Sequence, residues 1–215
     1  MKYILPLIIL GILLYFFPEI DLAISTLVFD ETAKFYLGND PILKAIYKSV
    51  NVLAITMFLG VVGAYIYQLY TKKTLKYFDK KALLYIFLVF AFGSGVVINL
   101  GLKQNFGRAR PAEIVQFGGE KKFTPAAVIN WEYGKECDSF TCGHCSFALG
   151  FIAFFFLFRK TWILIAALSY GLIVSIGRIL QGGHFFSDFV FSWIIMLLTA
   201  RLLYDYMYRD EHIAS

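Results

Sequence analysis

The sequence is poor in charged residues. Asp, Glu, Lys and Arg make up 16 % of its 215 residues, against roughly 25 % in soluble globular chains. Hydrophobic residues make up 59 %, and a soluble domain of this size would not cover so much apolar surface with so few charges. This scarcity excludes an ordinary soluble globule, a disordered chain and a charged coiled coil, and it predicts an all-α integral membrane protein.

Cysteine is also scarce. The chain has three cysteines, which excludes a disulfide-dense secreted scaffold, and they lie within nine residues as Cys137, Cys142 and Cys145. The neighbouring His144 leaves three interpretations open: a zinc site, a disulfide from Cys137 to either of the other two, or free thiols. None of the three begins a Cys-x5-Arg motif, so a cysteine-dependent phosphatase is excluded.

The few charges are distributed unevenly along the chain. Six runs contain none: 3–18, 50–70, 82–102, 139–158, 161–177 and 189–200. A spanning helix needs about 20 mostly apolar residues, so the runs predict a six-span helical bundle that forms a single domain over residues 1–215. The first run has the alternative of a signal peptide with Lys2 before it, but no small-x-small cleavage motif follows. The segment 20–29 is too short to span and predicts an interfacial amphipathic helix.

The short loops indicate which side of the membrane each end faces. The loop 71–81 carries five lysines, and Arg159 and Lys160 form the other short basic loop. By the positive-inside rule both loops lie in the cytoplasm. The outer segments are then 19–49, 103–138 and 178–188. The net charge of +5 accordingly indicates cytoplasmic loops and anionic lipid as partners, and we expect no nucleic-acid binding.

Three groups of polar residues fall at the outer ends of the predicted spans. These candidate site residues are Lys103, Arg108 and Arg110 after the third run, Gly143 and His144 at the start of the fourth, and Arg178, His184 and Asp188 between the last two. Ionisable residues at a membrane edge are costly and usually functional. The third histidine, His212, lies in a polar tail where a solvated side chain is expected.

The spacing of His184 and Asp188 suits nucleophilic chemistry. If a helix begins near His184, the two side chains share one face of its first turn. Asp188 can then accept the Nδ1 proton and leave Nε2 as a free lone pair. Gly182 and Gly183 just before it allow close approach of backbone or ligand.

The remaining groups suit an anion. Free N–H groups at the helix start near Gly143 bind anions, and His144 is placed to protonate a leaving group. Arginine and lysine match phosphate oxygens. Phosphoryl transfer depends mainly on such charge stabilisation. Asp188 is the one acid in these groups, so we expect no metal and no other cofactor.

These motifs resemble the three-part signature of the type-2 phosphatidic acid phosphatase superfamily. The matching elements are Lys-x6-Arg-Pro over 103–111, Gly-His at 143–144 and Arg-x5-His-x3-Asp over 178–188. The resemblance implies a six-span bundle that hydrolyses phosphate esters through a phosphohistidine. It implies His184 as nucleophile, Asp188 as its orienting acid and His144 as general acid. It implies that phosphate is bound by Lys103, Arg110, Gly143 and Arg178.

One position departs from this signature. The usual Pro-Ser-Gly-His reads Thr141-Cys142-Gly143-His144 here, so a hydroxyl donor is lost. We keep Cys142 as a candidate phosphate contact through its backbone N–H, and Arg108 has no role in the signature.

Further stretches resemble the bacterial lipid A 4′-phosphatase branch: 17–21, 117–125 and 181–188. This resemblance implies a bacterial inner-membrane enzyme with its site facing the periplasm and a lipid phosphate as substrate, and no obligatory protein partner is expected. Alternatives are an undecaprenyl pyrophosphate or phosphatidylglycerophosphate phosphatase and, outside enzymes, an anion transporter. The transporter is poorly supported because the spans 50–70 and 82–102 carry few polar residues.

Overall fold

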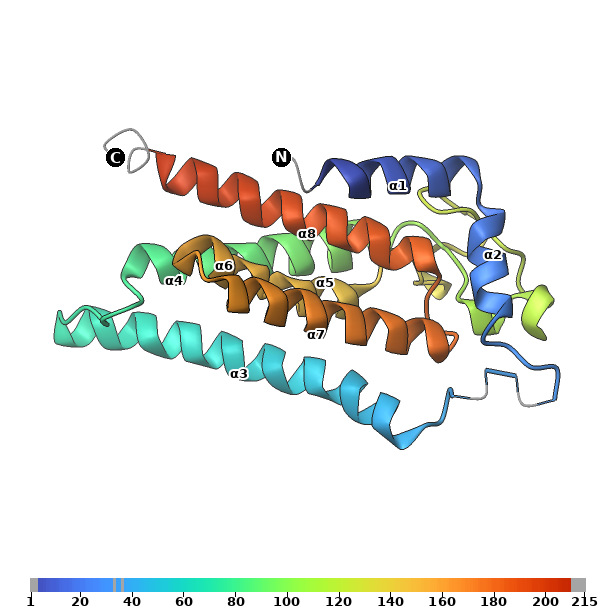
Figure 1. Cartoon of the computed structure of the whole chain (residues 1–215), viewed down its shortest axis with the longest axis horizontal. Helices are drawn as coiled ribbons and strands as arrows, with labels where there is room; N and C mark the ends of the chain where they lie inside the picture. The colour runs from blue at the N-terminus through green and yellow to red at the C-terminus, as the bar shows by residue number, and fades with distance from the viewer. Residues whose placement is uncertain (1–3, 33, 36, 210–215) are drawn as a thin grey trace.

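The chain folds into a bundle of helices, and a computed structural model describes residues 4–32, 34–35 and 37–209 (Figure 1). Lys2 and His212, named above, lie outside the described residues. The helices are α1 (Leu5–Phe16), α2 (Glu19–Thr26), α3 (Pro41–Thr71), α4 (Lys80–Leu88), the π-helical η1 (Val89–Lys103) that continues α4, three short 3-10 turns η2 (Pro111–Glu113), η3 (Val115–Phe117) and η4 (Gly134–Glu136), then α5 (Gly143–Gly150), α6 (Ile152–Phe158), α7 (Thr161–Leu180) and α8 (Phe186–Met207). No sheet forms within the described ranges, so the predicted all-α class is confirmed.

Local sequence signals fix where the long helices begin. The Asp40 carboxylate accepts hydrogen bonds from the N–H groups of Ile42 and Leu43 at 2.9 Å, and Pro41 occupies the first turn of α3. Asp79 accepts from the N–H of Ala82 at 2.7 Å and begins α4 in the same way. These contacts satisfy donors that a helix start otherwise leaves free.

The count of six spans is not confirmed. Among the described residues, four helices are long and apolar enough to cross a membrane: Pro41–Thr71, Lys80–Lys103, Thr161–Leu180 and Phe186–Met207. The bent pair α1 and α2, which meet at 94°, would make a fifth. The predicted run 139–158 contains only Gly143–Phe158 as helix, about 24 Å long at 1.5 Å per residue and short of a ~30 Å hydrocarbon core. Helix α2 overlaps the predicted segment 20–29, and its predicted interfacial position is not confirmed.

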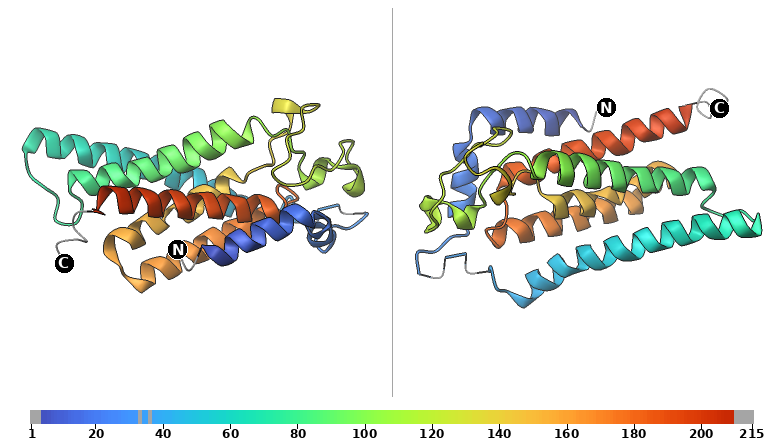
Figure 2. Two further views of the ribbon diagram at one scale, coloured as in Figure 1. Left: turned by 90° about the horizontal axis from the view of Figure 1, so that it is seen from above. Right: turned by 180° about the vertical axis from the view of Figure 1, so that it is seen from behind.

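The core lies around α5. This helix contacts α7, α8, η1 and α3, and all but one of its residues are buried. Helix α3 differs, because only 6 % of its most apolar window is buried inside the protein, and Figure 2 shows it along the outside of the bundle. Most of the surface of α3 is therefore not covered by the other helices, as expected of a helix that faces lipid.

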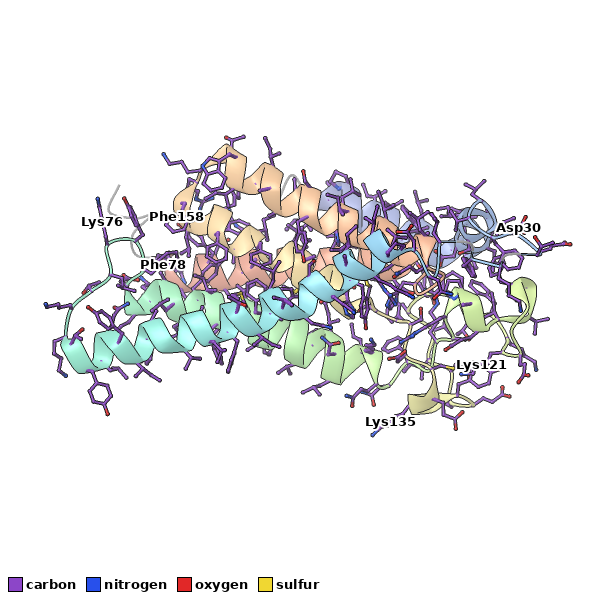
Figure 3. All side chains as sticks on the ribbon, turned by 90° about the horizontal axis from the view of Figure 1, so that it is seen from below. Asp30, Lys76, Phe78, Lys121, Lys135 and Phe158 are labelled. Carbon is purple, nitrogen blue, oxygen red and sulfur yellow. A yellow bond between two sulfur atoms is a disulfide. The ribbon has the colours of Figure 1, made fainter. Side chains whose placement is uncertain are left out.

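The two ends of the bundle carry different loops. Figure 3 shows Lys76, from the basic loop 71–81, at one end beside Phe78 and Phe158, and Lys121 and Lys135 at the other. The second end also holds α2 and the connections 104–142 and 181–185 (Figure 1). The candidate site residues all belong to this second end.

Candidate functional site

The candidate site forms where four helices end or begin at the same end of the bundle. Lys103 is the last residue of η1 and Arg178 lies in the last turn of α7, while Gly143 and His144 open α5 and Asp188 lies in the first turn of α8. Arg110 precedes the short turn η2, and His184 lies in the connection between α7 and α8. The bundle thus brings the three sequence motifs together.

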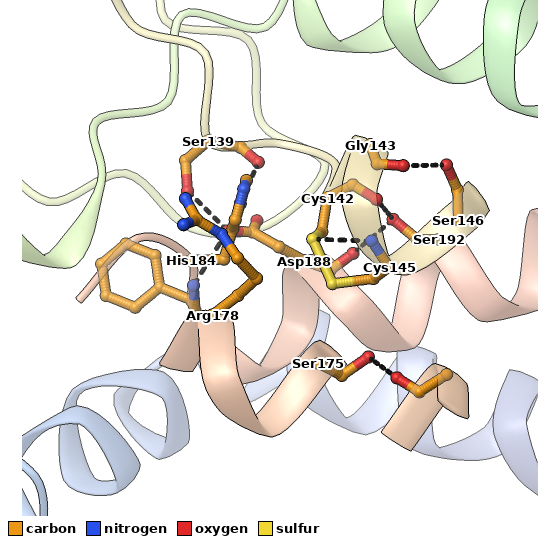
Figure 4. Close-up of a disulfide and its surroundings, with 12 residues drawn as sticks. Ser139, Cys142, Gly143, Cys145, Ser146, Ser175, Arg178, His184, Asp188 and Ser192 are labelled. Carbon is orange, nitrogen blue, oxygen red and sulfur yellow. Dashed lines mark hydrogen bonds and ion pairs between the residues drawn. A yellow bond between two sulfur atoms is a disulfide. The ribbon is translucent and has the colours of Figure 1, made fainter. Parts of the chain in front are cut away.

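The ring of His184 is held from one side. Its Nδ1 lies 2.9 Å from the carbonyl oxygen of Ser139 and 3.4 Å from Oδ2 of Asp188, and the side chain is 1 % exposed. A carbonyl oxygen only accepts, so Nδ1 carries the proton and Nε2 has the free lone pair. We expected Asp188 to accept this proton, but α8 begins at Phe186, after His184, and the backbone of Ser139 is the nearer acceptor (Figure 4).

Burial keeps this imidazole neutral. It lowers the pKa of His184 to about 4 from the ordinary 6.5, an effect that Asp188 opposes and the positive charge of Arg178 reinforces. The neutral form is the one that presents a lone pair, so the environment favours the nucleophilic state at neutral pH.

Asp188 is the centre of a buried polar network. Its Oδ2 accepts from the hydroxyl of Ser139 at 2.6 Å and from the N–H of Phe185 at 2.9 Å, and its Oδ1 pairs with Nη1 of Arg108. Nη2 of Arg108 lies 2.7 Å from Oδ2 of Asp21 in α2. All three charged side chains are fully buried, so Arg108 ties α2 to the acid beside His184.

The start of α5 is shaped to leave its amides open. The N–H groups of Gly143 and His144 have no hydrogen-bond acceptor among the residues that the structure describes. A Cβ at position 143 would lie 2.5 Å from Oδ1 of Asn99, so any larger residue would displace that side chain. Two free amides at a helix N-terminus form an anion-binding arrangement.

The cysteines form a pair that is not among the interpretations left open by the sequence. Cys142 and Cys145 form a disulfide across the first turn of α5, with their Cα atoms 5.2 Å apart (Figure 4). Cys137 is a buried free thiol whose sulfur lies 2.9 Å from Nζ of Lys121. Of the three interpretations left open, the disulfide from Cys137 is contradicted, and the free thiol holds for Cys137 but not for Cys142 and Cys145. Within the described ranges no three His, Cys, Asp or Glu side chains gather as a metal site, and the zinc interpretation gains no support.

The sulfur and the backbone N–H of Cys142, the candidate phosphate contact, both make hydrogen bonds within the protein. Its sulfur accepts a hydrogen bond from the N–H of Cys145 at 3.2 Å, and its own N–H donates to the carbonyl of Asp188 at 3.4 Å. Cys142 therefore links the start of α5 to α8. The free amides are those of the next two residues, Gly143 and His144.

Two of the candidate cations share one carboxylate. Nη2 of Arg110 lies 2.6 Å from Oδ1 of Asp138, and Nζ of Lys103 lies 3.3 Å from Oδ2 of the same residue. A carboxylate that bridges two cations occupies the geometry a phosphate would take. Lys103 and Arg110 are thus close enough to bind one anion.

The guanidinium of Arg178 packs directly against Gly183. A Cβ at Gly183 would lie 2.3 Å from Nη2 of Arg178, so the small residue makes room for the guanidinium. Nη1 of Arg178 donates to Oε1 of Gln181 at 2.8 Å. The close approach at Gly183 is therefore made by a side chain, where the sequence predicted backbone or a ligand.

Unpartnered polar atoms concentrate in this site. Seven buried side-chain nitrogen or oxygen atoms lack a hydrogen bond within the described chain, and four belong to predicted site residues: Nε of Arg110 and Arg178, and Nε2 of His144 and His184. Buried polar groups are normally paired. The two arginine Nε groups can donate to an acceptor-rich anion, and Nε2 of His184 offers a lone pair beside them.

Three residues of this site are not among the candidates predicted from the sequence: Asp21, Ser139 and Asp138. Arg108 is among the candidates, but without a specific role. Asp21 carries a usable signal, since an acid in a short apolar segment needs a partner. Ser139 contributes its hydroxyl to Asp188 and its backbone carbonyl to His184, and no residue identity encodes the carbonyl.

Comparison with known proteins gives one family and one curated relative. The PAP2 superfamily model matches residues 84–211. A protein described as lipid A 4′-phosphatase, from Francisella tularensis subsp. novicida (strain U112), is 32 % identical over 218 residues, which cover 95 % of this chain and 97 % of that protein. No solved structure gives a significant match.

Proposed function

The chain belongs to the PAP2 superfamily and is a phosphatase, and from that premise we propose that it removes a phosphate monoester from a membrane lipid. The observation that carries the proposal is the cluster of unpartnered atoms on Arg110, Arg178, His144 and His184. A phosphate group is an acceptor-rich anion that would satisfy these donors and present phosphorus to a free imidazole nitrogen.

The proposed reaction has two steps. Nε2 of His184 attacks phosphorus, the P–N bond forms, and the P–O bond to the lipid breaks as His144 gives its proton to the leaving oxygen. Burial and the nearby cations lower the pKa of His144 to about 3, and the negative charge of the bound phosphate would raise it so that His144 can hold this proton. Water then attacks the phosphohistidine, His144 takes a proton from that water, and inorganic phosphate leaves with His184 restored.

The charges are arranged to stabilise this transfer. Lys103, Arg110, Arg178 and the amides at the start of α5 would bind the equatorial oxygens. Asp188 lies 3.4 Å from Nδ1 of His184 and would stabilise the positive imidazole that forms when Nε2 is phosphorylated. No step uses a metal ion.

A lateral opening suits a lipid. A cavity of about 190 Å³ reaches Lys103, Gly143 and His144 and is walled by α3 and η1. A second cavity of about 300 Å³ shares Ala54, Asn99 and Phe147 with it and continues between apolar side chains of the same two helices. An acyl chain in this path adds about 0.8 kcal/mol per buried methylene, so a long-chain lipid phosphate should have a higher kcat/KM than a short soluble ester.

Lipid A is the substrate we propose, at its 4′-phosphate, because the curated relative is described by that activity and spans nearly the whole chain. We further propose a bacterial inner membrane, with the basic loop 71–81 in the cytoplasm and the site facing the periplasm.

Phosphate release by the purified chain tests the proposal. We expect release from lipid A in detergent without a protein partner and in the presence of EDTA, no turnover by His184→Ala, and a small residual rate for Asp188→Asn. Thermal unfolding of His184→Ala should match the wild type and serves as the folding control. Faster release from undecaprenyl pyrophosphate or phosphatidylglycerophosphate would replace lipid A, and no release from any lipid would reject the enzyme's assignment to lipids.

A further inference from the structure

Tyr47 of α3 lies against two residues of the candidate site. Its ring centroid is 4.2 Å from that of His144, with the planes 29° apart, so the two rings stack. On the same residue, the guanidinium carbon of Arg178 lies 4.9 Å from the ring centroid. A single aromatic side chain thus contacts the expected general acid and an expected phosphate ligand.

These contacts come from a helix that otherwise packs little. Val50 and Gln68 are the fully buried residues among those described in α3. Tyr47 lies outside residues 84–211, which match the family, so the family signature does not include it. Its position beside the site follows from the docking of α3 rather than from a motif.

The ring adds to the single hydrogen bond that Nη1 of Arg178 makes with Gln181. Nε2 of His144 and Nε of Arg178 have no hydrogen-bond partner among the described residues. A stacked ring fixes the plane of the imidazole, and a guanidinium is attracted to the face of an aromatic ring. The hydroxyl of tyrosine takes part in neither contact.

We propose that Tyr47 is a positioning residue that holds His144 in line with the leaving oxygen and Arg178 against the phosphate. The proposal rests on the proposed phosphatase reaction. It requires the aromatic face and not the hydroxyl, so phenylalanine should replace tyrosine with little loss, whereas an aliphatic side chain should not.

The test compares Tyr47→Phe and Tyr47→Leu on two substrates. One is a lipid phosphate with an alkyl leaving group, which needs a proton from the general acid. The other is an aryl phosphate whose phenol leaves without one. Relative to wild type we expect Tyr47→Phe to stay within about threefold on both, and Tyr47→Leu to lose kcat by ~30-fold or more on the lipid but far less on the aryl ester.

Ser49→Ala is the matched control, because the Ser49 hydroxyl lies 2.9 Å from the hydroxyl of Tyr170 and joins α3 to α7 away from the site. Its kinetics should match the wild type. Wild-type kinetics of Tyr47→Leu, or a Tyr47→Phe as poor as Tyr47→Leu, would each overturn the role of Tyr47. Equal losses of Tyr47→Leu on both substrates would overturn its role in positioning His144. Tyr47→Met, judged by the same ratio, replaces the leucine variant if the latter unfolds. A wild type that hydrolyses neither substrate would instead reject the proposed function.

Discussion

At the scale of single residues, the site contains its own anion. Asp138 bridges Lys103 and Arg110 at 3.3 and 2.6 Å. Burial acts to raise the pKa of Asp138, but the two cations outweigh it and hold that pKa below its usual value. The carboxylate is therefore charged at neutral pH, and a phosphate has to displace it to reach the same two cations.

Removing this charge should strengthen phosphate binding. We expect Asp138→Asn to lower both the KM for the lipid phosphate and the inhibition constant of inorganic phosphate about two- to fivefold, the scale of a partly exposed ion pair. Steady-state kinetics with added phosphate measures both. Glu136→Gln, an exposed acid in the same loop, should change neither constant. A higher KM for Asp138→Asn would mean that the carboxylate organises the cations instead of competing for them.

His184 gives the stability a defined pH dependence. The folded chain holds its pKa near 4, and the unfolded chain titrates near 6.5. Between these values the unfolded state binds a proton that the folded state does not, so stability falls as pH falls from 6.5 to 4, by up to about 3 kcal/mol. Urea unfolding in detergent at several pH values should show a shallower decline for His184→Gln than for wild type, and parallel curves would contradict the assignment.

At the scale of elements, α2 is anchored to the site by charge. Oδ1 of Asp21 accepts from the N–H of Ser187 at 2.8 Å, and Oδ2 pairs with Arg108. The same arginine pairs with Asp188. Loss of one member of a buried ion pair lowers the stability of the fold, because the remaining charge stays buried away from water.

Asp21→Asn should therefore damage both fold and site. We expect a loss of about 1–3 kcal/mol of unfolding free energy, because charge-assisted hydrogen bonds to Asp21 are lost while Arg108 keeps Asp188 as a partner, together with a fall in kcat as Arg108 and Asp188 shift. Chemical denaturation and phosphate release measure the two effects. Glu19→Gln changes an exposed acid of the same helix and should alter neither stability nor activity. An Asp21→Asn variant with wild-type stability and activity would show that α2 is not anchored in this way.

The sequence predicted the site better than it predicted the helices that hold it. Histidine, arginine and aspartate at fixed spacings identify phosphoryl chemistry directly. Helix length is harder, because apolar composition continues through bends and loops: the run 139–158 is charge-free, yet its helix starts only at Gly143. The anchoring roles of Asp21 and Ser139 depend on the packing of α2 and of the loop before α5, which no local pattern records.

At the scale of the whole molecule, the site and the basic loop lie at opposite ends of the bundle (Figure 3). Gln116 and Thr74 are exposed at these two ends. Cys142 and Cys145 are joined and buried, and Cys137 is buried. The native disulfide can therefore stay in place in a labelling experiment, with only Cys137 replaced.

Single cysteines should show which end faces the periplasm. In a Cys137→Ala background, Gln116→Cys in intact cells should react with an impermeant maleimide, and Thr74→Cys should react only after the membrane is opened. The background protein without added cysteine should stay unlabelled. The opposite pattern would put the site in the cytoplasm and reject a periplasmic substrate.

The exposure of α3 makes the surrounding lipid a wall of the site. This helix carries Tyr47 against the imidazole of His144, yet only 6 % of its apolar window is buried by protein, so in a bilayer acyl chains would cover most of the rest. Lateral pressure and fluidity of the bilayer then act on the distance between α3 and η1. The turnover number becomes a property of the enzyme and its membrane together, and the same chain should work at different rates in thick, ordered bilayers and in thin, fluid ones.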